Sequence, residues 1–277
     1  MAVRLVTDST ASIPSEVFAQ LHITVIPLTV VFGETAYQDG VDLDNATFFA
    51  KLKQASQLPH TTQPSPAAFT EAYDALLAQG HTVLSVHVSS ALSGTLNSAH
   101  LGRDACSAPN GITVIDSRLT SMSLGLAVIA GARAAETGSS LDEVRAAVES
   151  VLAGVELLLF VDTLEYLQRG GRIGAARAFL GSLLNVKPLI TLRNGAVEPV
   201  GQVRTRARAL ERLREWAAEH TTIRGFSVLH TASLPDAQAL FDELHARFPA
   251  AEAYLVECGP VVATHVGPGG VGLTLYA

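Results

Sequence analysis

The sequence has few cysteines and few charged side chains, and each shortage excludes a class of protein. Only two cysteines, Cys106 and Cys258, occur in 277 residues, and neither belongs to a CxxC pair. A disulfide scaffold and a cysteine-based zinc cluster are therefore excluded. Charged residues make up 16% and the net charge is −7, so the basic surface of a nucleic-acid-binding protein is missing. The 48% hydrophobic content is far from that of a disordered chain.

Long apolar runs are also missing. No stretch reaches the roughly 20 uninterrupted apolar residues that a membrane-spanning helix needs. Residues 1–8 indicate a first strand rather than a signal peptide. We therefore expect a soluble, cytoplasmic protein without a membrane span. Its mean hydropathy of +0.30 is high for such a protein, which is compatible with a large apolar interior or with one that holds an apolar ligand.

Short apolar strands alternate with helical patterns in the first part of the chain. This order is typical of a parallel sheet with helices on both faces. Later the pattern changes, and Asn194-Gly195 between two apolar runs predicts a hairpin. We predict an α/β protein of two domains with a ligand cleft between them. Residues 1–160 form a doubly wound, mostly parallel sheet in this prediction, and residues 161–277 form an α+β domain.

Four polar clusters interrupt the apolar background. They are Asp8-Ser9-Thr10, Thr61-Thr62-Gln63-Pro64-Ser65, Ser89 to Thr95, and Thr264 to Gly270. The first three each allow two interpretations. Hydroxyl and carboxylate groups before a helix commonly cap its N–H groups, whereas polar groups at the carboxyl end of a strand commonly bind a ligand.

The third and fourth clusters suggest the chemistry of an anion site. The first N–H groups of a helix lack partners within the helix and favour an anion. Ser93 and Thr95 add hydroxyl donors there, and Gly94 lets a ligand oxygen approach the backbone. His265 stands on a predicted loop of Gly, Pro and Val, where its imidazole could donate a hydrogen bond to an oxyanion. A structural role for His265 is equally compatible with the sequence.

Other chemistries lack their signatures. The sequence has no G-x-S-x-G motif, no Walker A loop and no metal-binding spacing among its nine histidines. A serine-dependent acyl or phosphate ester hydrolase or transferase, with Ser93 as nucleophile and His265 as base, is the alternative to a binding protein. The arginines between positions 204 and 214 predict a solvated helix face or a docking site for an acidic partner. A DNA-binding regulator is disfavoured, since the charge is negative and no helix-turn-helix signature is present.

Taken together and in order, ten segments resemble the DegV family from residue 4 to the C-terminus. These segments are Asp8-Ser9-Thr10-Ala11, Ile26-Pro27-Leu28, Tyr37-Gln38-Asp39-Gly40, Thr61-Thr62-Gln63-Pro64-Ser65, Ser93-Gly94-Thr95, Asp116-Ser117, Leu164 to Gly174, Lys187-Pro188, Val203-Arg204-Thr205-Arg206 and Thr264-His265-Val266-Gly267-Pro268-Gly269. The usual T-S-Q-P of the family is Thr61-Thr62-Gln63-Pro64 here, which keeps the hydroxyl.

The resemblance implies a fatty-acid-binding protein that is not itself an enzyme. One long-chain fatty acid would lie between the two domains, with no other cofactor. A separate ATP-dependent subunit of the fatty acid kinase system would phosphorylate its carboxylate, and the acyl phosphate would feed phospholipid synthesis. The carboxylate contacts carry over to Thr61, Ser93, Gly94 and His265. Contacts with the kinase subunit carry over to Arg169, Arg172, Arg204 and Arg206.

Overall fold

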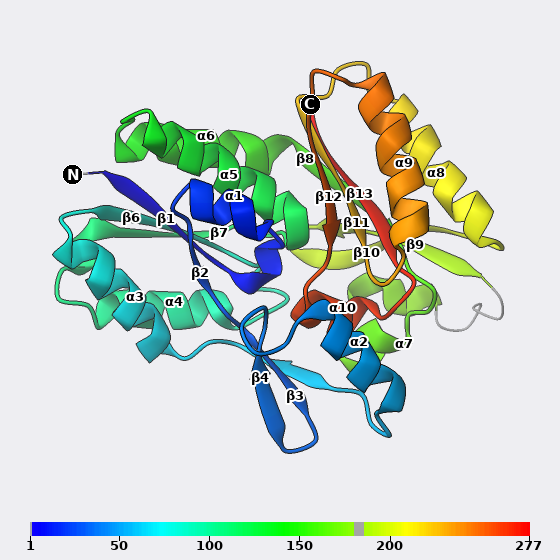
Figure 1. Cartoon of the computed structure of the whole chain (residues 1–277), viewed down its shortest axis with the longest axis horizontal. Helices are drawn as coiled ribbons and strands as arrows, with labels where there is room; N and C mark the ends of the chain where they lie inside the picture. Colours follow the sequence, from blue (N-terminus) through cyan, green and yellow to red (C-terminus); the bar gives the residue numbers. More distant parts are fainter. Residues whose placement is uncertain (1, 180–185) are drawn as a thin grey trace.

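Three β-sheets organise the described part of the chain, residues 2–179 and 186–277, in this computed structural model (Figure 1). The first sheet is parallel, with the order β2 (Thr24–Ile26), β1 (Val3–Asp8), β6 (Thr82–His87) and β7 (Ile112–Asp116). The second is mixed, with the order β10 (Ala196–Val203), β9 (Lys187–Arg193), β8 (Val155–Phe160), β13 (Val271–Tyr276), β11 (Gly225–His230) and β12 (Glu252–Glu257). The third is antiparallel, with the order β4 (Thr35–Gln38), β3 (Thr29–Phe32) and β5 (His60–Thr62). The predicted α/β class is confirmed.

Helices cover both faces of the first sheet and the outer face of the second (Figure 1). On the first sheet, α3 (Pro66–Ala78) and α4 (Thr95–Asp104) cover one face, and α5 (Ser121–Glu136) and α6 (Leu141–Gly154) cover the other. On the second sheet, α8 (Arg206–Ala218) and α9 (Leu234–Arg247) cover the outer face. The shorter helices are α1 (Ser15–Gln20), α2 (Asn45–Gln54), α7 (Glu165–Arg169) and α10 (Pro260–Val266), with 3-10 turns η1 (Ser9–Ala11), η2 (Pro109–Gly111) and η3 (Gly174–Phe179).

The α5 helix joins the first and second sheets into one apolar core. Twelve of its 16 residues are buried, which is typical of a helix that is packed on nearly all sides. One buried cluster contains Leu5 of β1, Ile129 of α5, Leu157 of β8 and Leu229 of β11. The two larger sheets are therefore held against each other through this helix.

Local sequence signals explain several element boundaries. The Ser140 side chain and Glu143 form a reciprocal capping box at the start of α6. Ser65 caps α3, whose first residue is Pro66. The predicted hairpin is confirmed, and Asn194 and Gly195 have φ angles of 50° and 84°. A turn with two positive φ angles matches the twist of the flanking strands, and Asn-Gly is the pair that accommodates it best.

The N-terminal region contains short strands that belong to two different sheets. The β-rich stretch from Thr24 to Phe32 forms two strands in different sheets, with β2 at the edge of the first sheet and β3 in the third. Pro27 lies between them, and because proline lacks an N–H it cannot continue a strand ladder. The short strands β4 and β5 follow no apolar alternation that would have predicted them. The division between residues 160 and 161 stays a prediction; the second sheet itself begins with β8.

The close approach of α3 and α4 generates a stability prediction. A Cβ on Gly102 of α4 would lie 2.5 Å from the Phe69 Cβ and 2.8 Å from the Pro66 carbonyl oxygen. We expect Gly102→Ala to lower the free energy of unfolding by about 1–3 kcal/mol through overpacking, although alanine favours a helix by about 1 kcal/mol. Gly201→Ala, where a Cβ would meet nothing within 4 Å, should change it by less than about 0.5 kcal/mol. Urea unfolding measures both, and a stabilised Gly102→Ala would contradict the packing account.

Candidate functional site

A pocket lies where the carboxyl ends of the first sheet face the strands β8, β9 and β10. It leaves about 730 Å³ of space between its walls, mouth included, and twelve of its nineteen lining residues are apolar. These twelve are Leu28, Val88, Leu92, Leu157, Leu159, Leu167, Ile190, Leu192, Val197, Val261, Val262 and Val266. Such a lining suits an extended apolar ligand. The pocket is built from segments more than 200 residues apart in the sequence.

Seven polar residues also line this pocket. They are Thr10, Thr61, Ser93, Thr120, Arg172, Thr191 and His265. The Thr10 hydroxyl donates to Asp8 Oδ1 at 2.6 Å, and the Thr191 hydroxyl donates to the Leu157 carbonyl oxygen at 2.6 Å. Each hydroxyl carries a single proton, so these two oxygens can only accept hydrogen bonds. Donors for an anionic ligand must come from the other residues.

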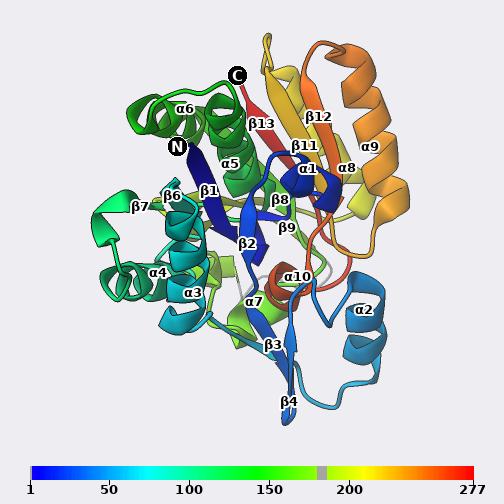
Figure 2. The ribbon, with the colours of Figure 1, turned by 60° about the vertical axis from the view of Figure 1, so that its left-hand side comes forward.

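Thr61 and His265 meet inside the pocket. The Thr61 Oγ1 atom of β5 lies 2.9 Å from His265 Nε2. The sequence predicted a loop around His265, and this prediction is wrong: the residue is in the last turn of α10. This seven-residue helix begins after Gly259 and ends at Gly267, whose φ is 76°, so the glycines and prolines mark its ends. Figure 2 shows α10 beside α7, β3 and the first sheet, and it contacts β5 as well.

His265 is a neutral side chain at pH 7. Its burial, and then the nearby positive charge of Arg172, lower its pKa to about 4. A neutral imidazole has one N–H, and its Nδ1 atom is buried without a partner in the described chain. We assign the proton to Nε2, because an N–H is costlier to leave unpaired than a lone pair. Nε2–H then donates to Thr61, which leaves the Thr61 hydroxyl proton free to donate into the pocket.

Gly170 makes room for the histidine ring. A Cβ at this position would lie 2.3 Å from His265 Nδ1, so any side chain here would displace the imidazole. This is the physical reason for a glycine in the segment Arg169-Gly170-Gly171-Arg172, which follows α7. The same segment positions Arg172, whose Nε donates to the Leu92 carbonyl oxygen at 2.9 Å and whose Nη1 donates to that of Gly170 at 2.6 Å.

The four arginines expected at a docking surface have different surroundings. Arg172 lines the pocket, and no carboxylate of the described chain lies within ion-pair distance of it. Arg169 is exposed and pairs with Glu165, and Arg204 is exposed just after β10. Arg206 makes structural contacts: it pairs with Asp236 and donates to the Gly269 carbonyl oxygen. Docking to a partner stays a prediction for all four, and the surface of Arg169 and Arg204 is available for it.

Ser93 reaches the pocket from the start of α4. Its hydroxyl lies 2.9 Å from the Thr95 hydroxyl and accepts a hydrogen bond from the Thr95 N–H at 3.3 Å. Gly94 caps this helix without lining the pocket, and a Cβ on it would lie 2.7 Å from Gln63 Nε2. Ser89, at the start of this cluster, has a structural role, since its hydroxyl donates to the Gly195 carbonyl oxygen. The structure therefore brings Thr61, Ser93 and His265 to one pocket, with Gly94 directly behind Ser93.

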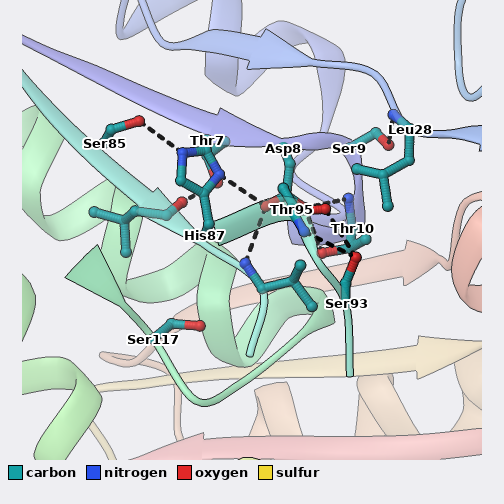
Figure 3. A network of polar contacts seen from close by, with 12 residues as sticks. Thr7, Asp8, Ser9, Thr10, Leu28, Ser85, His87, Ser93, Thr95 and Ser117 are labelled. Carbon is teal, nitrogen blue, oxygen red and sulfur yellow. Dashed lines mark hydrogen bonds and ion pairs between the residues drawn. The ribbon is translucent and has the colours of Figure 1, made fainter. Parts of the chain in front are cut away.

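A buried chain of polar groups holds the first polar cluster in place (Figure 3). Asp8 accepts hydrogen bonds from the N–H and the hydroxyl of Thr10 and from the Val88 N–H, and its Oδ2 lies 2.9 Å from His87 Nδ1. His87 Nε2 lies 2.6 Å from the Ser85 hydroxyl, which lies 2.7 Å from the Tyr73 hydroxyl. Donation from Tyr73 through Ser85 and His87 to Asp8 gives every proton an acceptor. Thr10 and Val88 line the pocket, so this network fixes part of its wall.

Ser85, His87 and Asp8 have the order of a hydrolase triad but not its accessibility. All three side chains are fully buried. In the part of the chain that the structure describes, Ser85 does not line the pocket or the neighbouring surface cavities. The sequence reasoning missed this network, although His87 and Ser85 are unusual polar residues within an otherwise apolar strand. Asp8 serves as the cap of η1, which was one of the two interpretations of its cluster.

A surface basin adjoins the polar end of the pocket. Thr61, Arg172 and His265 line both the pocket and this basin, together with His60, Tyr166 and Arg169 on the outer side. A ligand group held at Thr61 and His265 is therefore near the surface, while the rest of the pocket runs into the apolar interior. No helix in the described residues has the length and apolarity to cross a bilayer. Within the same residues, no three His, Cys, Asp or Glu side chains are grouped to hold a metal ion.

Comparisons with known proteins place the chain among close relatives over its whole length. The family model described as DegV, an uncharacterised protein, matches residues 2–277. A DegV domain-containing protein of Streptomyces coelicolor is 39% identical over 277 residues, which cover 99% of this chain and 98% of that protein. A solved DegV family protein from Thermus thermophilus, described by its fatty acid binding, has a TM-score of 0.91 and 36% identity, with 100% of both chains covered. DegV of Bacillus subtilis, described as a fatty acid binding protein, has a TM-score of 0.90 and 34% identity, again with 100% of both chains covered.

The wall behind the pocket contains a carboxyl group that makes stability depend on pH. Burial raises the pKa of Asp39 from 3.8 to about 7, against the opposing effects of the Ser9 hydroxyl and the Val261 N–H. The folded protein therefore holds this proton more tightly than the unfolded chain. The contribution of this proton to the free energy of unfolding is fully present below the pKa that Asp39 has in the unfolded chain. It is lost as the pH rises to about 7, and the loss is up to about 4 kcal/mol.

We expect Asp39→Asn, which stays neutral, to remove this loss. As the pH rises from 5 to 8, the free energy of unfolding of the variant should increase relative to that of the wild type. Urea unfolding of both proteins at pH 5 and at pH 8 measures this. Asp42→Asn, on the exposed side of the same turn, is the control and should follow the wild type. Equal pH dependence in Asp39→Asn and the wild type would show that this carboxyl does not titrate as described.

Proposed function

The chain belongs to the DegV family, and we propose that its pocket binds one long-chain fatty acid. The carboxylate lies at Thr61, Ser93 and His265, and the hydrocarbon chain extends among the apolar residues of β8, β9 and β10. One observation carries the proposal: within a mostly apolar pocket, Thr61, Arg172 and His265 lie together where the pocket meets the surface basin, and the Thr61 hydroxyl has a proton to donate. The descriptions of the Thermus thermophilus and Bacillus subtilis relatives as fatty acid binding support it.

Burial of the hydrocarbon chain supplies most of the affinity. About 15 methylene groups at about 0.8 kcal/mol each contribute on the order of 12 kcal/mol. The loss of translational, rotational and internal freedom offsets several kcal/mol of this. Leu157, Ile190 and Leu192 face this part of the pocket from two neighbouring strands. Because rigid strands form this wall, the apolar surface is present before the ligand arrives.

The polar end keeps the ligand ionised and correctly oriented. A carboxylate removed from water needs donors for its oxygens; otherwise it takes up a proton. The Thr61 hydroxyl, oriented by His265, and the Ser93 hydroxyl supply donors. The predicted contact with the Gly94 N–H would need the ligand to reach past Ser93, since Gly94 does not line the pocket. Arg172 adds a positive charge that no carboxylate of the described chain neutralises. The ligand carboxylate is the counter-ion that this arginine lacks.

The position of the carboxylate suits transfer of a phosphoryl group by another protein. We propose that a separate ATP-dependent kinase subunit in the cytoplasm phosphorylates the bound acid, and that the acyl phosphate supplies phospholipid synthesis. The basin beside Thr61 and His265 opens the carboxylate to the surface, and exposed Arg169 lies at that basin. Arg204 extends the available basic surface. The protein then contributes position rather than acid–base chemistry.

The geometry disfavours the alternative of a serine hydrolase. Such an enzyme needs the nucleophile within hydrogen-bond reach of its base. His265 Nε2 contacts Thr61, whereas the Ser93 hydroxyl contacts Thr95. The low pKa of His265 also makes it a weak base. We therefore interpret the chain as a lipid-binding carrier.

Neighbouring threonines of β5 provide a matched test of the carboxylate site. Thr61 lines the pocket, whereas Thr62 is exposed and does not. We expect Thr61→Val to weaken fatty acid binding by roughly tenfold, because the ligand loses one charge-assisted hydrogen bond and His265 loses its acceptor. Thr62→Val should leave binding unchanged.

Two measurements check this prediction. Mass spectrometry of the lipid extracted from purified protein gives the amount and identity of the bound acid, and about one molecule per chain is expected for the wild type. Titration of delipidated protein with palmitate then gives the affinity of each variant. Equal affinities for Thr61→Val and Thr62→Val would show that the carboxylate does not lie at Thr61.

A further inference from the structure

A second and larger groove lies on the other side of the pocket wall. It leaves about 1630 Å³ of space, its open mouth included. It is formed by η1 and α1, the link between β2 and β3, the turn before α2, and the link between β12 and α10. Apolar side chains such as Ile13, Phe18, Pro27 and Leu255 form much of its surface. Val41 at its margin is 69% exposed. The proposed fatty acid site uses none of this space.

The groove has carboxylates and no basic side chain. No Lys, Arg or His is among its lining residues, whereas Asp8, Glu16, Asp39, Asp44 and Glu257 are; of these, Asp8 is paired with His87. Elsewhere in the described chain, acidic residues commonly have an arginine partner, as in the pairs Arg133–Glu252 and Arg214–Glu243. Glu257 accepts hydrogen bonds from the Asn45 side chain and the Ala232 N–H, and its one ion-pair contact in the described chain is His230, whose pKa is lowered by burial. Negative charge without an internal counter-ion is therefore concentrated here.

A buried carboxylate in the groove is the second sign of a missing partner. Asp39 is 5% exposed, and its Oδ2 atom has no hydrogen-bond partner. Groups of this kind are rare in folded proteins, because an unpaired buried acceptor costs free energy. The negative charge of Asp8 nearby makes the ionised form still less favourable. A positive group entering the groove would relieve both effects.

We propose that this groove is a docking site for a basic segment of a partner protein. A lysine or arginine side chain would direct its charge toward Asp39, with Glu16, Asp44 and Glu257 around it. The aliphatic part of such a side chain would pack on the apolar surfaces of Ile13, Phe18 and Pro27, as long basic side chains do at amphipathic sites. A metal ion is a poor occupant, since the described residues group no three metal-ligating side chains.

The docking site shares its wall with the fatty acid pocket. Ser9, Pro27 and Pro260 line the groove. The residues that directly follow them in the sequence, Thr10, Leu28 and Val261, line the pocket. The Leu28 N–H also donates to the Ser9 hydroxyl at 3.1 Å across this wall (Figure 3). A partner bound in the groove therefore contacts the reverse side of the segments that enclose the ligand.

The experiment maps binding of a defined basic peptide on the whole protein. Acetyl-Arg-Ala-Arg-amide is titrated into 15N-labelled protein, and amide shifts locate the site. The largest shifts are expected at Gly40, Ala46 and Gly259, which line the groove. Glu16→Gln with Asp44→Asn should weaken binding at least about fivefold. Asparagine preserves the helix cap that Asp44 provides at α2.

A matched double variant separates specific docking from general attraction to an acidic protein. Glu34→Gln with Glu71→Gln removes the same charge from exposed positions outside the groove, and should weaken binding less than about twofold. Equal weakening by both double variants, or shifts centred elsewhere, would overturn the proposal. Tighter binding of spermidine than of the peptide at the same amides would also overturn it, in favour of a small polyamine. Lipid extraction from the same samples tests the fatty acid site independently.

Discussion

The proposed site depends on matching one anionic group with donors at the end of an apolar pocket. A carboxylate in such a place is stable only if hydroxyl, amide or cationic groups replace its water. We propose that side chains from distant segments meet this need: Thr61 of β5, oriented by His265 of α10, and Ser93 before α4. None of these elements forms the site alone. The arrangement of the three sheets therefore serves to bring short polar segments together around a single ligand end.

The surrounding contacts explain why so few polar groups suffice. Asp8 and His87 hold Thr10 in the wall with its proton directed to Asp8, and Gly170 leaves room for the His265 ring. His265 is kept neutral by burial, so it orients Thr61 rather than carrying charge. The charge comes from Arg172, held by two backbone carbonyls. In the proposed site, orientation and charge are thus supplied by different residues, which would keep the ligand carboxylate ionised and in place.

Sequence patterns predicted the architecture better than the site. Alternating strands and helices indicated the parallel sheet, and Asn194-Gly195 located the hairpin, because these depend on neighbouring residues. The site depends on contacts across 204 residues, as between Thr61 and His265, and no local pattern contains that information. Thr61, Ser93, Gly94 and His265 came together only through the family resemblance. The inward position of Arg172, the helix that carries His265 and the buried chain from Tyr73 to Asp8 required the structure.

A crystal structure of the protein with palmitate would test the central claim most directly. The account predicts electron density for one extended acyl chain along Leu157, Ile190 and Leu192. The carboxylate oxygens should lie within hydrogen-bond distance of the Thr61 and Ser93 hydroxyls, beside the Arg172 guanidinium. An acyl chain with its carboxylate at the opposite end of the pocket, or a ligand bound outside it, would contradict the account.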